Sequence, residues 1–167
     1  RVGQEYPSPK NTHEDLSDCY CRQSVIASVT GIRRHSRMAR LYVLGAGTPT
    51  PTPNRFGSAY VLDIEGEKIM FDCGPATTHK LVQSGLWPLD IDYIFFTHHH
   101  FDHDIDYPCF LLTRFDQSIG KENQLQVFGP TLTEKITEGV IGEDGIFSHD
   151  WKARIYHPLS QKVYQNR

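Results

Sequence analysis

The sequence predicts a domain in which short apolar strands alternate with helices. Three observations lead to this expectation. Apolar runs of strand length end at Gly or Asp turn signals, helical spacing follows several of them, and one strand runs directly into a cluster of His residues. At 167 residues the chain has about the size of one domain.

The expected strands are short and separated by turns. Residues 41–44 (LYVL) are typical of a buried strand that ends at a Gly-containing turn. Residues 58–64 and 68–71 form a predicted hairpin whose turn lies at residues 65–66. The run 91–96 (IDYIFF) predicts a further strand.

Helices are expected between and after these strands. The first should bury Leu81 and Val82 and end before Gly85. A later helix should begin with Thr131 as its N-cap, because Glu134 lies at capping-box spacing. The predicted helices cover residues 76–84, 107–115 and 131–140, with a strand at 125–128, a loop at 141–150 and a last strand beginning over 151–156.

Residues 97–103 (THHHFDH) form the most informative segment of the chain and hold four of its nine His residues. His98 and His100 lie two positions apart, so in an extended segment they point to one side, and Asp102 continues that side. His103 is adjacent, and a turn would bring it beside Asp102. Imidazole and carboxylate are ligands of zinc and related divalent ions. A His-rich surface turn is the alternative, which the preceding apolar strand and the embedded Asp disfavour.

The pattern His-x-His-x-Asp-His over residues 98–103 resembles the metal-binding signature of the metallo-β-lactamase superfamily of hydrolases. Residues 44–51 (LGAGTPTP) are similar to the opening strand and turn of its ribonuclease Z and arylsulfatase-like branch, and residues 72–74 (DCG) match the family's early Asp-x-Gly. The resemblance covers residues 40–160 approximately. It implies an α+β fold, the αββα sandwich of that superfamily, of which this chain would hold the first half.

The resemblance also implies a cofactor of two divalent metal ions. His98 and His100 would hold the first ion, and Asp102 and His103 the second. Asp102 would in addition be the catalytic base. Zinc is the expected metal, with manganese or iron as alternatives, because His and Asp side chains suit all three.

Three further residues have expected roles. Asp72, from the Asp-x-Gly, would orient the metal-binding residues from behind them. Arg55 is a candidate contact for an anionic substrate. The ring of His99, between the first two ligands, should face away from the metals.

The family needs further ligands from its second half, namely a third His, a bridging Asp and a last His. Later candidates in this chain are His149 and His157, with Asp144 and Asp150, and neither His is favoured as a ligand. We therefore expect this chain to hold half of a dinuclear site and to be a piece of a longer protein.

The implied function is metal-dependent hydrolysis by a ribonuclease Z-like phosphodiesterase that uses a metal-bound hydroxide. Its partner would be an anionic ester substrate, with RNA as a candidate. Alternatives are an arylsulfatase-like or other ester hydrolase, and a non-catalytic metal-binding or interaction fragment. A further alternative is that a second chain completes the metal site across an interface.

Composition bounds the partners and the compartment. The net charge of −3 gives no bulk attraction to nucleic acid or anionic membranes, and no apolar stretch approaches membrane-spanning length. The four scattered Cys residues indicate the reduced thiols of a cytoplasmic protein. Residues 1–39 are polar and predict a mobile lead-in, and residues 40–167 predict the N-terminal part of a metallo-β-lactamase-fold domain.

Overall fold

The computed structural model describes residues 38–50, 52–118 and 124–157. All but the last two residues of the predicted lead-in fall outside this part of the chain. The strands are β1 (Ala39–Gly45), β2 (Ala59–Ile64), β3 (Glu67–Phe71), β4 (Tyr93–Phe95) and β5 (Gln126–Phe128). The helices are α1 (Thr77–Gln83), α2 (Phe101–Asp104), α3 (Tyr107–Gln117), α4 (Thr133–Ile141) and α5 (Ser148–Tyr156), with a 3-10 turn η1 (Pro88–Asp90).

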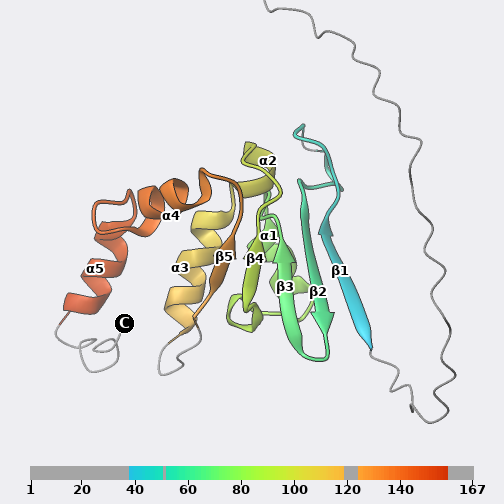
Figure 1. The fold of residues 1–167 in the computed structure, drawn as a ribbon, viewed down its shortest axis with the longest axis horizontal. Coiled ribbons are helices and arrows are strands. Elements are labelled where there is room, and N and C mark those ends of the chain that lie inside the picture. Colours follow the sequence, from blue (N-terminus) through green and yellow to red (C-terminus); the bar gives the residue numbers. More distant parts are fainter. Residues whose placement is uncertain (1–37, 51, 119–123, 158–167) are drawn as a thin grey trace, which may run out of the picture. The chain divides into compact units, whose positions relative to one another are not determined.

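The strands form one sheet in chain order (Figure 1). The pairs β1–β2 and β2–β3 are antiparallel, whereas β3–β4 and β4–β5 are parallel. Strands β1, β3, β4 and β5 therefore run in the same direction, and their C-terminal ends meet at one edge of the sheet. Helix α2 lies at this edge, directly after β4 (Figure 1). The polar segments that follow these four strands therefore lie together at this edge.

One face of the sheet carries the core. Val61, Met70 and Ile94 lie side by side on β2, β3 and β4 and are fully buried. Leu81 of α1 and Phe110 of α3 belong to the same buried cluster. Burial of side chains of this size stabilises a fold by about 1.5–3 kcal/mol each. The core thus fixes the sheet and its two covering helices as one unit.

The opposite face of the sheet is apolar and more exposed. Phe71, Phe95 and Phe128 stack across β3, β4 and β5, with ring centroids 5.8 and 4.6 Å apart. Leu41 and Val43 of β1 are 60% and 58% exposed.

Within the part of the chain that the structure describes, no helix is long and apolar enough to cross a membrane.

Most expected elements of the mixed fold are confirmed. The hairpin β2–β3 has its turn at Glu65 and Gly66, which adopt positive φ angles of 56° and 101°. Helices α1 and α3 occupy the predicted segments, and Pro108 lies in the first turn of α3, where its missing N–H costs nothing. Leu81 is buried as expected, but Val82 is 36% exposed, so its inward assignment was wrong.

The C-terminal assignments need correction. The predicted strand at residues 151–156 is part of helix α5, which begins inside the expected loop. The Trp151 indole donates to the carbonyl of Ile141 at 2.9 Å, and Arg154 pairs with Asp150 one turn earlier. These contacts outweigh the β-propensity of the aromatic residues. The N-cap of α4 is Leu132 and not Thr131, and no side chain caps that helix.

Glycines let the backbone segments at the functional edge approach closely. A Cβ atom on Gly74 would lie 2.1 Å from the carbonyl oxygen of Asp102, and one on Gly57 would lie 2.5 Å from the same oxygen. Gly45 packs equally closely against the carbonyl of Gly57. Real Cβ atoms do not approach backbone oxygens at such distances. Gly57 and Gly74 therefore allow α2 to sit directly against the loops after β1 and β3, and Gly45 lets the end of β1 pack against Gly57.

We predict that Gly74→Ala lowers the free energy of unfolding by about 1–3 kcal/mol, because the new methyl group must push α2 away from the sheet edge. Urea denaturation of the purified chain measures the change. The matched control is Gly139→Ala in α4, where a Cβ atom meets nothing within 4 Å. This control should be neutral or stabilising by up to about 1 kcal/mol. Equal stability of both variants would contradict the close packing at Gly74.

Candidate metal centre

The His-rich segment leaves β4 and turns into α2 at the functional edge. His100 is extended (φ −91°, ψ 150°) and is the N-cap of α2, so Asp102 belongs to a helical turn. The expected extended segment through residue 102 was therefore wrong. The short helix still serves the site, because it carries Asp102 and His103 back towards the preceding His residues.

Backbone hydrogen bonds hold this helix in place. The N–H of Ser58 donates to the carbonyl of Asp102 at 3.1 Å, and the N–H of Cys73 donates to the carbonyl of His103 at 2.6 Å. Both donors come from the loops that the glycines bring close. Burial raises the pKa of the Cys73 thiol well above its ordinary value, so Cys73 stays a protonated core residue.

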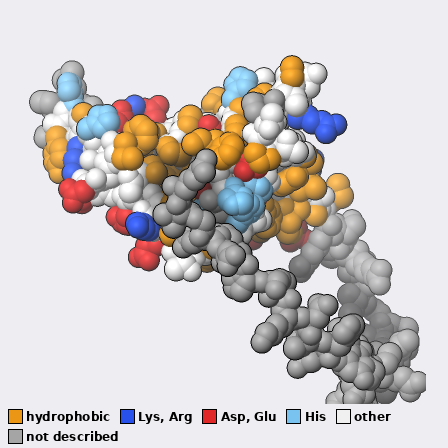
Figure 2. Space-filling model, turned by 90° about the horizontal axis from the view of Figure 1, so that it is seen from above, with side chains coloured by type: hydrophobic (Ala, Val, Ile, Leu, Met, Phe, Trp, Pro, Cys, Tyr) orange, Lys and Arg blue, Asp and Glu red, His pale blue; other side chains and the backbone are white. Residues whose placement is uncertain are grey.

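The predicted ligands gather at one place. The ring centroids of His98 and His100 lie 4.6 Å apart, and those of His98 and His103 lie 4.0 Å apart. Nε2 of His103 is 3.5 Å from Oδ2 of Asp102. Figure 2, which views the molecule from above, shows a group of His side chains bordered by hydrophobic side chains. Four donors from six consecutive residues thus share one small region.

Asp72 lies behind this group and accepts hydrogen bonds from four donors. They are the hydroxyl of Ser58 (3.1 Å), the N–H of Thr97 (2.8 Å), the hydroxyl of Thr97 (2.9 Å) and Nδ1 of His103 (2.7 Å). Asp72 is 2% exposed and has a positive φ of 59°. A left-handed conformation outside Gly costs roughly 1–3 kcal/mol. Hydrogen bonds to a carboxylate contribute about 1.5–3 kcal/mol each, so four of them offset this cost.

The hydrogen bonds of Asp72 determine which ring nitrogen of His103 carries the proton. A carboxylate only accepts, so Nδ1 of His103 must donate to Asp72. The lone pair of a neutral His103 then lies on Nε2, the nitrogen that points towards Asp102.

Asp72 also determines the tautomer of His98, through the hydroxyl of Thr97. The Thr97 hydroxyl donates its one proton to Asp72, so its oxygen is left to accept from Nδ1 of His98 at 3.0 Å. The lone pair of His98 then also lies on Nε2. One buried carboxylate therefore sets two imidazoles in the tautomer that leaves Nε2 available to a metal ion.

The donor set fits a divalent cation. Oδ1 of Asp102 is buried without a hydrogen-bond partner, and the residue is 4% exposed. A buried polar atom without a hydrogen-bond partner costs about 1–3 kcal/mol, and a charged group costs more. A cation shared with the free imidazole nitrogens would satisfy it. The described residues contain no group of three or more His, Cys, Asp or Glu side chains placed to hold one metal ion. The arrangement thus offers pairs of donors and not a closed shell.

The later His residues lie apart from this group. His149 is an exposed residue of α5, and its Nδ1 contacts the carbonyl of Ile146 at 3.1 Å. His157 is the exposed C-cap of the same helix. The loop assignment of His149 was wrong, and the expectation that neither residue is a metal ligand stays a prediction. The ring of His99 faces away from His98 and His100, as expected, and contacts Asp104 and Thr133.

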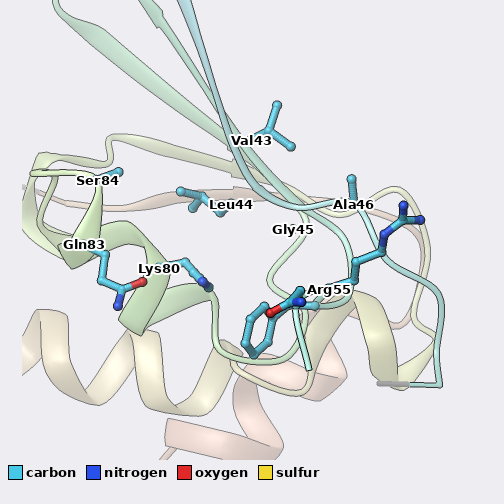
Figure 3. A pocket seen from close by; sticks show the side chains of 10 residues that line it. Val43, Leu44, Gly45, Ala46, Arg55, Lys80, Gln83 and Ser84 are labelled. Atoms are coloured by element: carbon cyan, nitrogen blue, oxygen red, sulfur yellow. The ribbon is translucent and has the colours of Figure 1, made fainter. Parts of the chain in front are cut away.

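Arg55 lies in a different surface feature from the His group. It is exposed and lines a shallow cavity of about 680 Å³ between the end of β1 and helix α1. Figure 3 shows Arg55 across this cavity from Lys80, whose ammonium group lies 4.5 Å from the centre of the Phe56 ring. None of the four candidate ligands lines the cavity. A substrate that reaches both features would have to extend along the edge of the sheet.

Sequence reasoning missed Ser58 and Thr97 as members of the site. Thr97 precedes the first His, and its position next to a ligand was the available signal. Ser58 lies 14 residues before Asp72, and their contact depends on strand pairing. No local pattern in the sequence points to it.

Comparisons with known proteins agree with this geometry. A family model for the metallo-beta-lactamase superfamily matches residues 52–107. Ribonuclease Z of Methanosarcina mazei is 33% identical over 101 residues, which cover 60% of this chain and 32% of that protein. Over these residues the chain is similar to the metallo-β-lactamase superfamily. Ribonuclease Z of Pediococcus pentosaceus is 42% identical over 88 residues, 52% of this chain and 28% of that protein.

Solved structures support the same branch of the superfamily. The short form of human tRNase Z superposes with a TM-score of 0.54 at 38% identity, over 59% of this chain and 38% of that one. The long form of ribonuclease Z from yeast gives a TM-score of 0.55 at 15% identity, over 80% of this chain and 18% of that one, which supports the fold alone. The α+β metallo-β-lactamase fold and the ribonuclease Z branch are confirmed. The chain spans well under half the length of these relatives.

We predict that Asp72→Asn changes the tautomer of His103. Asn tolerates the left-handed backbone at position 72, but its amide presents a donor to groups that themselves donate. Nitrogen-15 NMR of the His rings should show His103 with its proton on Nδ1 in the natural chain and a mixture of tautomers in the variant. His149, remote from Asp72, is the internal control. An unchanged His103 spectrum would contradict the orienting role of Asp72.

Proposed function

We propose that this protein is a metal-dependent hydrolase of the ribonuclease Z kind that cleaves phosphodiesters. One observation carries the proposal. Asp72 orients His103 directly and His98 through Thr97, so that the lone pair of each ring lies on Nε2, and Nε2 of His103 is 3.5 Å from Oδ2 of the buried Asp102. A purely structural role would not require the Nε2 atoms of His98 and His103 and the Asp102 carboxylate to be left available to a ligand.

In this proposal His98 and His100 hold one divalent ion, and Asp102 and His103 hold a second. Zinc suits these ligands best, and manganese or iron would also be accepted. Ions bound there would supply Lewis-acid polarisation of a phosphoryl oxygen and would lower the pKa of a water molecule towards neutrality. The buried Asp102 carboxylate would accept the proton of the attacking water.

The proposed substrate is an anionic ester, with RNA as the physiological candidate because of the likeness to ribonuclease Z. Arg55 would contact a phosphate remote from the cleaved bond, since a guanidinium pairs well with phosphate oxygens. The exposed Phe101 of α2 and Ile105, the C-cap of that helix, would form an apolar border to the substrate path. The free thiols of Cys73 and Cys109 support a reducing, cytoplasmic compartment.

A second candidate is a non-catalytic metal-binding fragment. The absence of a three-donor group among the described residues favours it, because two protein donors per ion bind weakly. The remaining donors would come from a second chain or from further residues of the protein. An arylsulfatase-like activity is the alternative within the same superfamily.

We predict that the chain, loaded with zinc, hydrolyses an aryl phosphodiester in preference to an aryl sulfate. His100→Ala and Asp102→Ala should each remove this activity to background, because each deletes a donor that the metal pair needs. The release of the aryl alcohol, followed by absorbance together with the zinc content per chain, measures both steps. His149→Ala is the matched control and should retain activity and zinc content.

The outcomes separate the candidates. Preferential cleavage of the aryl sulfate would support the arylsulfatase-like alternative. Zinc binding that depends on His100, without hydrolysis of either ester, would support the non-catalytic fragment. Activity that survives His100→Ala and Asp102→Ala would end the assignment of this site.

A further inference from the structure

His99 lies between two candidate ligands, but its side chain makes its contacts elsewhere. Nδ1 of its ring is 3.1 Å from Oδ2 of Asp104, and Nε2 is 2.7 Å from Oγ1 of Thr133. The side chain is 5% exposed, and its ring packs 5.1 Å from that of Phe96. Both nitrogens of this imidazole are thus used in contacts within the protein. It is a buried, fully partnered ring in a segment that otherwise leaves its imidazoles open.

These contacts exclude His99 as a ligand in this arrangement. Asp104 accepts only, so Nδ1 of His99 donates to it, and the lone pair on Nε2 accepts from the hydroxyl of Thr133. No lone pair remains for a metal ion. To bind one, the ring would have to give up its contact with Thr133 inside a packed environment, where an unmade hydrogen bond costs about 1–3 kcal/mol.

Asp104 and Thr133, the hydrogen-bond partners of His99, are themselves held in place. Asp104 ends α2, and Thr133 begins α4, where its N–H donates to the carbonyl of Pro130 at 2.9 Å. The Thr137 hydroxyl donates to the carbonyl of Thr133 at 2.9 Å and lies 3.1 Å from the hydroxyl of Tyr107. Burial raises the pKa of Tyr107 to about 12, so its phenol remains a neutral hydrogen-bonding group at ordinary pH. His99 is therefore tied directly to α2 and α4, whereas Thr137 joins α4 to α3 through Tyr107 and does not contact His99.

The backbone geometry connects His99 with its neighbours. In an extended segment, side chains at successive positions point to opposite sides. A ring that is held at both nitrogens on one side therefore restricts the backbone that directs residues 98 and 100 to the other side. The ring centroids of His98 and His100 lie 4.6 Å apart there.

We propose that His99 is a positioning residue that holds His98 and His100 in mutual register, so that metal affinity depends on its hydrogen bonds to Asp104 and Thr133. This inference rests on the proposed metal-dependent function. It adds that a contact from α4, outside the matched family segment of residues 52–107, takes part in forming the metal centre. His99 would act through its neighbours and would touch neither metal nor substrate.

The test measures cobalt affinity, because Co²⁺ replaces zinc and gives a visible absorption spectrum that reports ligand geometry. The variants are Thr133→Val, which removes the hydroxyl and keeps the shape, and His99→Leu. Chelator competition on the folded chain should show Co²⁺ binding weakened roughly 10–100-fold in both, as for lost outer contacts of metal-binding His residues. The Co²⁺ absorption bands should shift as well.

Two further variants separate positioning from general stability. Thr137→Val makes the same chemical change one turn later in α4 and should leave Co²⁺ affinity within about twofold, even where it lowers the melting temperature by a similar amount. His99→Gln, whose amide can still reach one partner, should recover part of the affinity lost in His99→Leu. If His99→Leu does not fold, the comparison of Thr133→Val with Thr137→Val decides.

Unchanged Co²⁺ affinity in Thr133→Val, with the natural chain binding well, would overturn the positioning role alone. An equal loss in Thr133→Val and Thr137→Val would overturn it too, because the effect would then be general destabilisation. If the natural chain binds Co²⁺ no better than His98→Ala does, the proposed function fails, and this inference fails with it.

Discussion

The carboxylate of Asp72 is the interaction on which the candidate centre depends. It collects the hydroxyl of Ser58, the backbone and hydroxyl of Thr97, and the Nδ1 proton of His103. These donors come from the loop before β2 and from the segment that runs from β4 into α2. Asp72 itself follows β3, so its carboxylate joins three segments at one edge of the sheet. Because a carboxylate can only accept, its position determines the proton positions of the neighbouring rings. The proton positions of the imidazoles and the packing of the segments behind them therefore both depend on the Asp72 carboxylate.

The sheet topology explains why these loops meet. Four strands run in the same direction, so the segments after them lie at one edge, where α/β folds usually place their ligands. Glycines at positions 57 and 74 then allow the backbone of α2 to approach these segments without a Cβ atom between them. The apolar core beneath is ordinary, whereas the edge above it has left-handed residues and a buried carboxylate oxygen without a partner.

Much of this architecture follows from local sequence signals. The turn at Glu65-Gly66 sufficed to predict the hairpin β2–β3, and the spacing within residues 97–103 sufficed to predict that these His and Asp side chains lie close together. The sequence could not reveal the contact of Ser58 with Asp72 or that of His99 with Thr133, since both join residues distant along the chain. It also misplaced residues 151–156, where tertiary contacts override an aromatic pattern that resembles a strand.

The location of a bound metal tests the central claim most directly. Crystals of the chain soaked in a zinc salt, with anomalous diffraction recorded on both sides of the zinc edge, would provide it. The account predicts the strongest anomalous peak within coordination distance of Nε2 of His98 or His103, beside Oδ1 of Asp102. A strongest peak at His149 or His157, with none at residues 98–103, would contradict the assignment of the metal centre.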